Sequence, residues 1–213
     1  MKKSLLILSL LLITGCVENF KKKEEATQTV KETKKDTSKQ YTKEQLELKK
    51  YLDEYLGYLH SLDTEGIIDM TYPKLFIPIN KIMFKRYINT LLSSPHISIE
   101  SFDTNITNIG EVQPYSDGKF AQIEYKSSIK LIFINPNLYN DDLSIRVLKD
   151  TLQDKYGKEN IKIYPEKRVI IIHEKQKLLA IKENNKEWKF IGDNPEYRKL
   201  YPDILPLDIL SKI

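Results

Sequence analysis

The feature that most constrains the fold of this chain is a long alternation of apolar and polar side chains over residues 119–134. The apolar positions of this segment are Ala121, Ile123, Tyr125, Ile129, Leu131 and Phe133. The polar positions between them are Gln122, Glu124, Lys126, Ser128 and Lys130. Because successive side chains of a strand point to opposite faces, this pattern predicts one long strand. One of its faces is expected to be dry, and the other to be wet or to face a pocket.

Further extended segments lie on both sides of this strand. Residues 96–109 are strand-like, and Asp117-Gly118, between the two segments, is a strong turn signal. Near the end of the chain, Asn184-Asn185-Lys186 is a second predicted turn. The short strands predicted in this later part are residues 161–164, 169–173, 178–183 and 188–191. Strands joined by short turns predict an antiparallel sheet.

Three helices are predicted before the first strand. Thr42 and Gln45 have the spacing of a capping box, and the helix that follows runs to about His60. Asp63 has the place of the N-cap of a short helix over residues 64–71, which Tyr72-Pro73 ends. Pro78 fits the first turn of a third helix. The residues of this third helix that we expect to face inward are Ile82, Met83, Tyr87, Leu91 and Leu92.

Two helices are predicted after the long strand. The first covers residues 141–156, begins near Asn140 or Asp141, and ends at Gly157. Its inward-facing residues are expected to be Ile145, Leu148, Leu152 and Tyr156. The second is a short apolar helix over residues 207–213. Because helices precede the strands rather than alternate with them, the chain is expected to be α+β.

Size and charge narrow the class of protein further. Residues 41–213 have the length of one domain, and they contain 25 basic and 25 acidic side chains. The net charge of +4 therefore comes from residues 1–40. Nucleic-acid binding needs a clustered positive charge, so we expect no nucleic-acid partner.

The N-terminus has the pattern of a secretory signal. Lys2 and Lys3 precede an apolar run over residues 5–13, which only Ser9 interrupts and which is too short to span a membrane. The run ends in Ile13-Thr14-Gly15-Cys16, which resembles the lipobox of bacterial lipoproteins. This resemblance implies that residues 1–15 are cut off and that lipid is attached to Cys16. A plain cleaved signal peptide with an incidental cysteine is the alternative.

Residues 16–40 are expected to form a flexible, lipid-anchored tether. The segment is rich in Lys, Glu, Thr and Gln and has almost no large apolar residue beyond Phe20, so it cannot offset its ordering entropy. Lys21, Lys22 and Lys23 could contact anionic head groups, but Glu24 follows at once and favours a solvated spacer. Val17 is not the Asp that marks inner-membrane retention in Gram-negative lipoproteins, so this resemblance favours the outer membrane.

Two segments resemble the nuclear-transport-factor-like, or SnoaL-like, family. They are YLDEYLGYLHSLDTEGIIDMTYPKLF at residues 51–76 and LLAIKENNKEWKFI at residues 178–191. The resemblance implies a cone-shaped, cystatin-like roll, in which N-terminal helices pack on a curled antiparallel sheet and enclose a pocket. The predicted helix over residues 141–156 is an insertion relative to the simplest members.

No residues of the predicted domain form a recognisable catalytic motif. Enzymes of this family use His, Asp and Tyr side chains in the pocket, but His60, His96 and His173 have no spacing to an acid that marks a dyad. Asp69 and Tyr72 are the nearest acid–phenol pair. We interpret this pair as a helix-end hydrogen bond and a core aromatic, and we expect no catalytic residue.

The sequence also lacks the patterns of metal and cofactor sites. Cys16 is the only cysteine, and no His-x-x-x-His or calcium-loop pattern occurs. The acidic run Asn140-Asp141-Asp142 lies where a helix cap is needed, which explains it. No glycine-rich phosphate loop or nucleophile elbow is present. We therefore expect no metal and no cofactor.

The chain is rich in tyrosine, with 13 residues. Tyrosine has an apolar body and a polar tip, so it suits a pocket wall, a partner surface or an ordinary core. We favour the core for any single residue. The aromatic residues of the N-terminal half concerned are Tyr51, Tyr55, Tyr58, Tyr72, Phe76, Phe84 and Tyr87.

These observations predict a non-catalytic lipoprotein of the cell envelope, whose domain binds a small apolar ligand or an envelope protein. Its contact with the membrane is expected to be the lipid on Cys16. Two alternatives remain. A dehydratase or isomerase of the same fold would hold a buried acid or histidine with a shifted pKa in its pocket. An immunity-type or structural protein would have a closed interior and an exposed aromatic patch.

Overall fold

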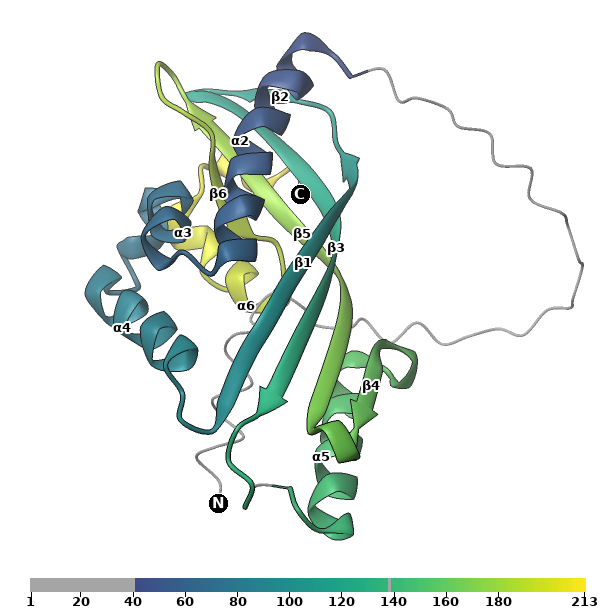
Figure 1. Ribbon diagram of the computed structural model, residues 1–213. Coiled ribbons are helices and arrows are strands. Elements are labelled where there is room, and N and C mark those ends of the chain that lie inside the picture. Colours follow the sequence, from purple (N-terminus) through teal and green to yellow (C-terminus); the bar gives the residue numbers. More distant parts are fainter. Residues whose placement is uncertain (1–40, 138) are drawn as a thin grey trace, which may run out of the picture.

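The computed structural model describes residues 41–137 and 139–213. Cys16, the predicted signal over residues 1–15 and the predicted tether over residues 16–40 lie outside the described residues. The described part is α+β, with a six-stranded antiparallel sheet that does not close into a barrel and with helices around it (Figure 1). The predicted fold class is confirmed at this level.

Three long strands form the centre of the sheet. The strand order is β1–β3–β5–β4, with β2 beside β3 and β6 beside β5. The bounds are β1 Ile97–Ile109, β2 Gln113–Tyr115, β3 Gly118–Phe133, β4 Ile161–Tyr164, β5 Val169–Glu183 and β6 Lys189–Gly192. The predicted alternation of β3 is confirmed, because all six of its predicted apolar positions are buried. We call the sheet face with Ile123 and Leu131 the inner face.

Residues 169–183 form one strand, where the sequence predicted two. The prediction ended the first strand at His173 because a polar stretch follows it. In β5, Glu174 and Gln176 instead point to the inner face and are buried, while Lys175 and Lys177 point outward. Glu174 and Gln176 pair in register with Ser127 and Tyr125 of β3, so the pairing with β3 continues without a break.

The first two helices lie where the sequence predicted them. Helix α2 spans Lys43–Ser61 and begins with the predicted capping box between Thr42 and Gln45. Helix α3 spans Thr64–Met70, and the Asp63 carboxylate accepts from two of its first N–H groups. Helix α2 buries Leu48 and Leu52 against the upper half of the inner face. Figure 1 shows α2 lying along that half of the sheet.

The third predicted helix is shorter and less buried than expected. A 3-10 turn, η1, covers Pro73–Phe76, and helix α4 spans Lys81–Leu92 with Asn80 as its N-cap, so the prediction for Pro78 was wrong. Leu91 is the one α4 residue that is buried. Ile82 and Met83 were predicted to face inward, but their side chains are 69% and 57% exposed. The helix is amphipathic, and six of its residues line a cavity that also borders the sheet.

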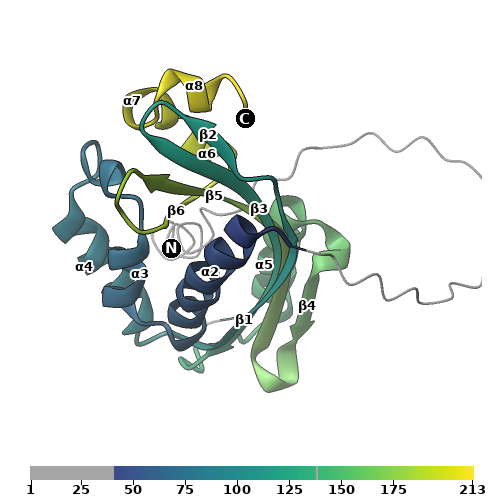
Figure 2. The same ribbon diagram turned by 90° about the horizontal axis from the view of Figure 1, so that it is seen from above.

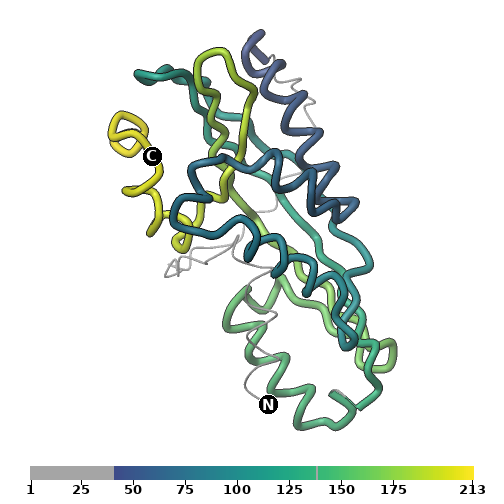
Figure 3. Tube along the Cα trace, turned by 90° about the vertical axis from the view of Figure 1, so that its left-hand side faces the viewer, coloured from purple at the N-terminus to yellow at the C-terminus, as the bar shows by residue number. Residues whose placement is uncertain are grey.

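Helix α5 covers the lower half of the inner face. It spans Asp142–Tyr156, begins at the N-cap Asp141 and ends at Gly157, as predicted. Its residues Leu148 and Leu152 pack with Ile170 and Ile172 of β5. The 3-10 turns η2 (Lys158–Asn160) and η3 (Pro165–Lys167) flank β4. In Figure 3, α5 lies at the end of the sheet that is far from the C-terminal helices.

The C-terminal segment covers part of the outer face. It forms three short helices, α6 (Pro195–Arg198), α7 (Tyr201–Ile204) and α8 (Leu207–Leu210), where the sequence predicted one over residues 207–213. Ile204 and Ile209 pack on Phe120 and Ile181, which point away from the inner face. Figure 2 shows α2 on one side of the strands and α7 and α8 on the other. This end of β3 is therefore buried on both faces.

Candidate functional site

A cavity of about 660 Å³ lies between the helices α2, α3 and α4 and the inner face of the sheet. Its floor includes Tyr125, Ile129 and Leu131 of β3, and Tyr197 of α6 adds to its wall. Helix α4 contributes the longest run of lining residues, which are Met83, Phe84, Tyr87, Ile88, Leu91 and Leu92. Met83 lines the cavity and is also largely exposed, so the cavity opens beside it. The volume is in the range of small-molecule sites.

The lining is apolar, with few polar groups. Its charged residues are Glu196 and Lys199, both exposed, and the Lys199 ammonium pairs with the Glu196 carboxylate at 2.8 Å. The Thr71 hydroxyl donates to the carbonyl of Ile67 at 2.7 Å, within its own helix. The polar groups that remain available inside are mainly phenols. Such a cavity favours an apolar occupant, because a buried polar group without a partner costs free energy.

Three tyrosines from different elements meet at the cavity. Tyr55 of α2 stacks on Phe190 with ring centroids 4.9 Å apart, and Tyr125 and Tyr197 come from β3 and α6. Burial raises the pKa of Tyr197 to about 12 and that of Tyr55 still further. Burial also raises the pKa of Tyr125, and the nearby phenols of Tyr55 and Tyr197 add to this. All three phenols are therefore neutral at physiological pH.

Next to the cavity floor, on the same inner face, a chain of buried polar side chains joins β3 to β5. The Tyr125 hydroxyl donates to the Gln176 side-chain carbonyl, and the Gln176 amide donates to the Glu174 carboxylate. Glu174 is 9% exposed. Its burial raises its pKa, while the hydrogen bond from Gln176 and the charge of Lys155 act in the opposite direction. No local pattern predicts this chain of hydrogen bonds, because polar residues such as Glu174 are typical of the end of a strand.

The raised pKa of Glu174 makes stability depend on pH. The folded state binds its proton more tightly than the unfolded state, so stability falls as pH rises from about 4.5 to the folded pKa. We expect Glu174→Gln to remove this loss, since glutamine can still accept from Gln176. Between pH 4 and pH 7, the free energy of unfolding of Glu174→Gln should therefore fall less than that of the unchanged chain. Urea unfolding at several pH values measures it.

Glu124→Gln is the matched control for this prediction. Glu124 lies on β3, is 49% exposed, and pairs with Lys177 at 3.6 Å. An exposed pair of this kind contributes about 0–1 kcal/mol, so its loss should leave the pH profile nearly unchanged. Identical pH profiles for Glu174→Gln and the unchanged chain would contradict the assignment of the pH dependence to Glu174.

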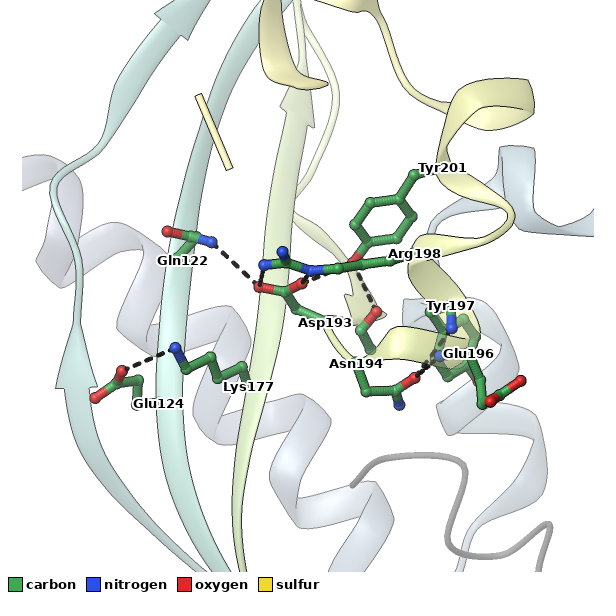
Figure 4. Close-up of polar contacts among 10 residues, drawn as sticks. Gln122, Glu124, Lys177, Asp193, Asn194, Glu196, Tyr197, Arg198 and Tyr201 are labelled. Atoms are coloured by element: carbon green, nitrogen blue, oxygen red, sulfur yellow. Dashed lines mark hydrogen bonds and ion pairs between the residues drawn. The ribbon is translucent and has the colours of Figure 1, made fainter. Parts of the chain in front are cut away.

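A second buried network holds the start of the C-terminal segment (Figure 4). The Asp193 side chain is fully buried, and its carboxylate accepts from Arg198 Nε at 2.6 Å and from Arg198 Nη2 at 3.2 Å. Gln122 of β3 donates to the same carboxylate at 3.1 Å. The Tyr201 hydroxyl donates to the carbonyl of Gly192 at 2.7 Å. Arg198 binds the Asp193 carboxylate through two nitrogens, which makes a bidentate ion pair. The acid of this pair is buried, whereas the arginine is 45% exposed and reaches the surface.

This network positions one wall of the cavity. Asn194 caps α6 by accepting from the N–H groups of Glu196 and Tyr197, at 2.9 and 3.0 Å. The Tyr197 ring then lies against Gly192, where a Cβ atom would approach it to 2.6 Å. Asp193 and Gly192 therefore influence the cavity by fixing the position of Tyr197. Neither Asp193 nor Arg198 lines the cavity itself.

The histidines considered in the sequence lie away from the cavity. His60 is in the last turn of α2, with Nδ1 3.2 Å from the carbonyl oxygen of Phe102 and 3.5 Å from the Asp103 carboxylate. His96 is exposed, and its ring contacts Asn135 at 3.1 Å. His173 is half-buried on the outer face of β5, opposite Ser128. The structure brings none of the three into the lining of the cavity.

The acidic candidates have structural partners. Tyr72 is buried, and its hydroxyl donates to the Glu183 carboxylate at 3.2 Å, so it does not pair with Asp69. Asp69 is exposed, 3.9 Å from the Lys81 ammonium. Asp141 caps α5 and accepts from the N–H and hydroxyl of Ser144, and these bonds lower its pKa. The interpretations of Tyr72 as a core aromatic and of Asp141 as a helix cap are confirmed, whereas the contact of Asp69 is an ion pair rather than the expected helix-end hydrogen bond. Cys16 lies outside the described residues.

The tyrosine-rich N-terminal half is divided between the core and the cavity. Tyr55 and Tyr72 are buried core residues, as expected, and Tyr55 also lines the cavity, as do Tyr87 and Phe84. The described residues include no group of three His, Cys, Asp or Glu side chains placed to hold a metal ion. No helix in the described part of the chain has the length and hydropathy to cross a membrane.

Searches with family models, curated proteins and solved structures found no significant match to this chain.

Proposed function

We propose that this chain is a cell-envelope lipoprotein, anchored through Cys16, whose α+β domain binds a small apolar ligand without catalysing a reaction. The observation that carries the ligand proposal is the cavity of about 660 Å³ with its apolar lining. Burying apolar surface contributes roughly 25 cal/mol per Å², so an apolar molecule gains free energy on entering such a space. The signal-like pattern over residues 1–16 supports the anchor.

The arrangement of elements supports the nuclear-transport-factor-like cone. In that family, the first helices and the inner face of a curled sheet enclose a pocket, and here α2 and α3 lie against the inner face with the cavity beside them. Helix α5 between β3 and β4 is the departure from the simplest members. We place the protein at the outer membrane if the cell is Gram-negative, because Val17 follows the cysteine.

The chemistry of the lining favours binding over catalysis. A dehydratase or isomerase needs an acid or base in contact with the substrate. Glu174 has a raised pKa but does not line the cavity, and the Gln176 side chain lies between it and Tyr125. The lining acid, Glu196, is exposed and paired with Lys199. Glu174 is thus separated from the occupant, and Glu196 is engaged in an exposed ion pair.

The surface-acting alternative has less support. It predicts a closed interior and an exposed aromatic patch. The described residues instead enclose an open cavity, and their most exposed large apolar side chains are aliphatic, with Leu207 at 82% and Ile77 at 74%. We therefore propose a ligand inside the domain in preference to a partner on its surface.

Filling the cavity should weaken binding. Ile67 and Ile88 line it from α3 and α4, so the double variant Ile67→Trp/Ile88→Trp places two indoles in the space. We expect the affinity for pyrene, a fluorescent apolar probe, to fall roughly tenfold or more, since even one methylene in an apolar pocket changes binding by about 10- to 200-fold. Fluorescence titration of the full chain measures it.

The matched control makes the same change outside the cavity. Ile77 and Ile82 lie in the same part of the chain, are 74% and 69% exposed, and do not line the cavity. Ile77→Trp/Ile82→Trp should therefore bind pyrene as the unchanged chain does. Equal pyrene affinity of the two double variants, or no pyrene binding by the unchanged chain, would refute the ligand proposal.

A further inference from the structure

The uncharged polar side chains that line the cavity include three phenols, those of Tyr55, Tyr125 and Tyr197. The three side chains reach it from α2, β3 and α6, and all line the same space. The Tyr125 phenol is near enough to the other two for them to influence its ionisation. Small-molecule sites commonly combine apolar walls with a few placed polar groups that select the ligand. The chemistry of these phenols therefore bears on which molecule enters.

The three hydroxyls offer different hydrogen-bonding roles. The Tyr125 hydroxyl uses its proton toward Gln176, which in turn donates to Glu174. Because a phenol has one proton, its oxygen can only accept from an occupant of the cavity. No hydrogen bond joins the Tyr55 or Tyr197 hydroxyl to another described residue, so both can donate. Donors and an acceptor together suit a group that both accepts and donates.

The cavity offers no counter-charge to a charged group. The lining residues Glu196 and Lys199 neutralise each other at 2.8 Å and are exposed. An ionised carboxylate or ammonium inside would lose its hydration without gaining an ion pair, which is costly. A neutral group would lose only its hydrogen bonds to water on entering the cavity, and hydrogen bonds to the phenols can replace them.

We propose that the cavity takes an uncharged, largely apolar molecule that carries one hydroxyl group, which bonds to the phenols of Tyr55, Tyr125 and Tyr197. This inference rests on the proposed function, since it concerns the ligand of the same cavity. The hydroxyl donates to the Tyr125 oxygen and accepts from Tyr55 or Tyr197. The rest of the molecule lies against the aliphatic lining between β3 and α4.

Three matched probes test this selectivity at pH 7: pyrene, 1-hydroxypyrene and pyrene-1-carboxylate. We expect the full chain to bind hydroxypyrene roughly 3- to 10-fold more tightly than pyrene, the gain of a typical net hydrogen bond. The carboxylate should bind most weakly. The double variant Tyr55→Phe/Tyr197→Phe keeps the acceptor of Tyr125 but removes both donors, so the preference for hydroxypyrene over pyrene should become smaller while pyrene affinity stays the same.

Tyr115→Phe is the control, because Tyr115 is a buried tyrosine that packs in the outer-face core and does not line the cavity. It should keep the full preference for hydroxypyrene. Tightest binding of the carboxylate, or an unchanged preference in the double phenylalanine variant, would overturn the inference. If pyrene still binds in that case, the proposed function stands and only the selectivity is wrong. Absence of binding for all three probes would refute both.

Discussion

Asp193→Ala should lower the free energy of unfolding by about 2–4 kcal/mol, the cost of losing charge-assisted hydrogen bonds to a buried carboxylate. Asp193 accepts from both Arg198 and Gln122, and its side chain has no exposed surface. Its removal leaves Gln122 without this partner and frees the start of the C-terminal segment from β3. Urea unfolding followed by circular dichroism measures the loss.

Two further variants distinguish the network from a general effect of mutation. Glu196→Ala removes an ion pair from α6, the helix that contains Arg198. Because that pair is exposed, we expect the free energy of unfolding to change by no more than about 1 kcal/mol. Asp193→Asn keeps the shape of the side chain and one acceptor oxygen. Its loss in free energy of unfolding should therefore lie between those of Asp193→Ala and Glu196→Ala. If Asp193→Ala is no more destabilising than Glu196→Ala, the network does not hold the C-terminal segment.

The same variant links stability to the cavity. Asp193 lies one residue after Gly192, on which the Tyr197 ring packs, and one residue before the cap of α6. Loss of the network should therefore loosen the wall that contains Tyr197. In Asp193→Ala we expect weaker pyrene binding under conditions where the chain is still folded, because an ordered wall preorganises the site.

Local patterns predicted most of the regular structure. The capping box of Thr42 and Gln45 and the N-cap Asp63 involve residues within a few positions of one another, so their signals are complete in the sequence. The alternation of β3 was equally readable, since one face of the sheet is buried along its whole length. The three-residue strand β2 was missed because it is too short to show a period.

The cavity could not be derived in the same way. The apolar period of α4 indicated the face that turns toward the sheet, but not the distance to the sheet. A helix over a filled core and a helix over a cavity have the same apolar pattern in the sequence. Over a cavity, residues such as Met83 line the space and are still partly exposed to solvent. The family resemblance pointed to a pocket, but the residue pattern of the long strand allowed one only on its polar face, whereas the cavity lies against its apolar face. The helix spacing that creates it depends on contacts between distant segments.

The buried polar groups were the least predictable part. Glu174 and Gln176 break the apolar alternation, so the pattern predicts a break between two strands, although their side chains continue the alternation of direction through β5. Asp193 is buried by residues from β3 and from the C-terminal segment, which no local window contains. A buried acid is uncommon without partners, and its partners become visible only in three dimensions.

Cys16→Ala should release the protein from the membrane or stop its processing. In the proposed lipoprotein, the Cys16 thiol carries diacylglycerol, and the new amino terminus carries a further acyl chain. Each buried methylene contributes about 0.8 kcal/mol, so a single chain anchors marginally, whereas two or three chains hold the protein permanently. The chain contains no second cysteine that could take over. Phase partitioning in detergent and the mass of the intact protein measure the change.

Ser9→Ala is the matched control, because it keeps Cys16 and leaves the apolar run over residues 5–13 intact. It should remain membrane-bound and keep the mass added by the lipid. A Cys16→Ala variant that still partitions into the membrane phase and still has the mass of a lipidated chain would refute the anchor. The anchor and the cavity are separate claims, since pyrene binding depends only on residues of the described part. Refuting the anchor would therefore leave a ligand-binding domain whose location has to be established anew.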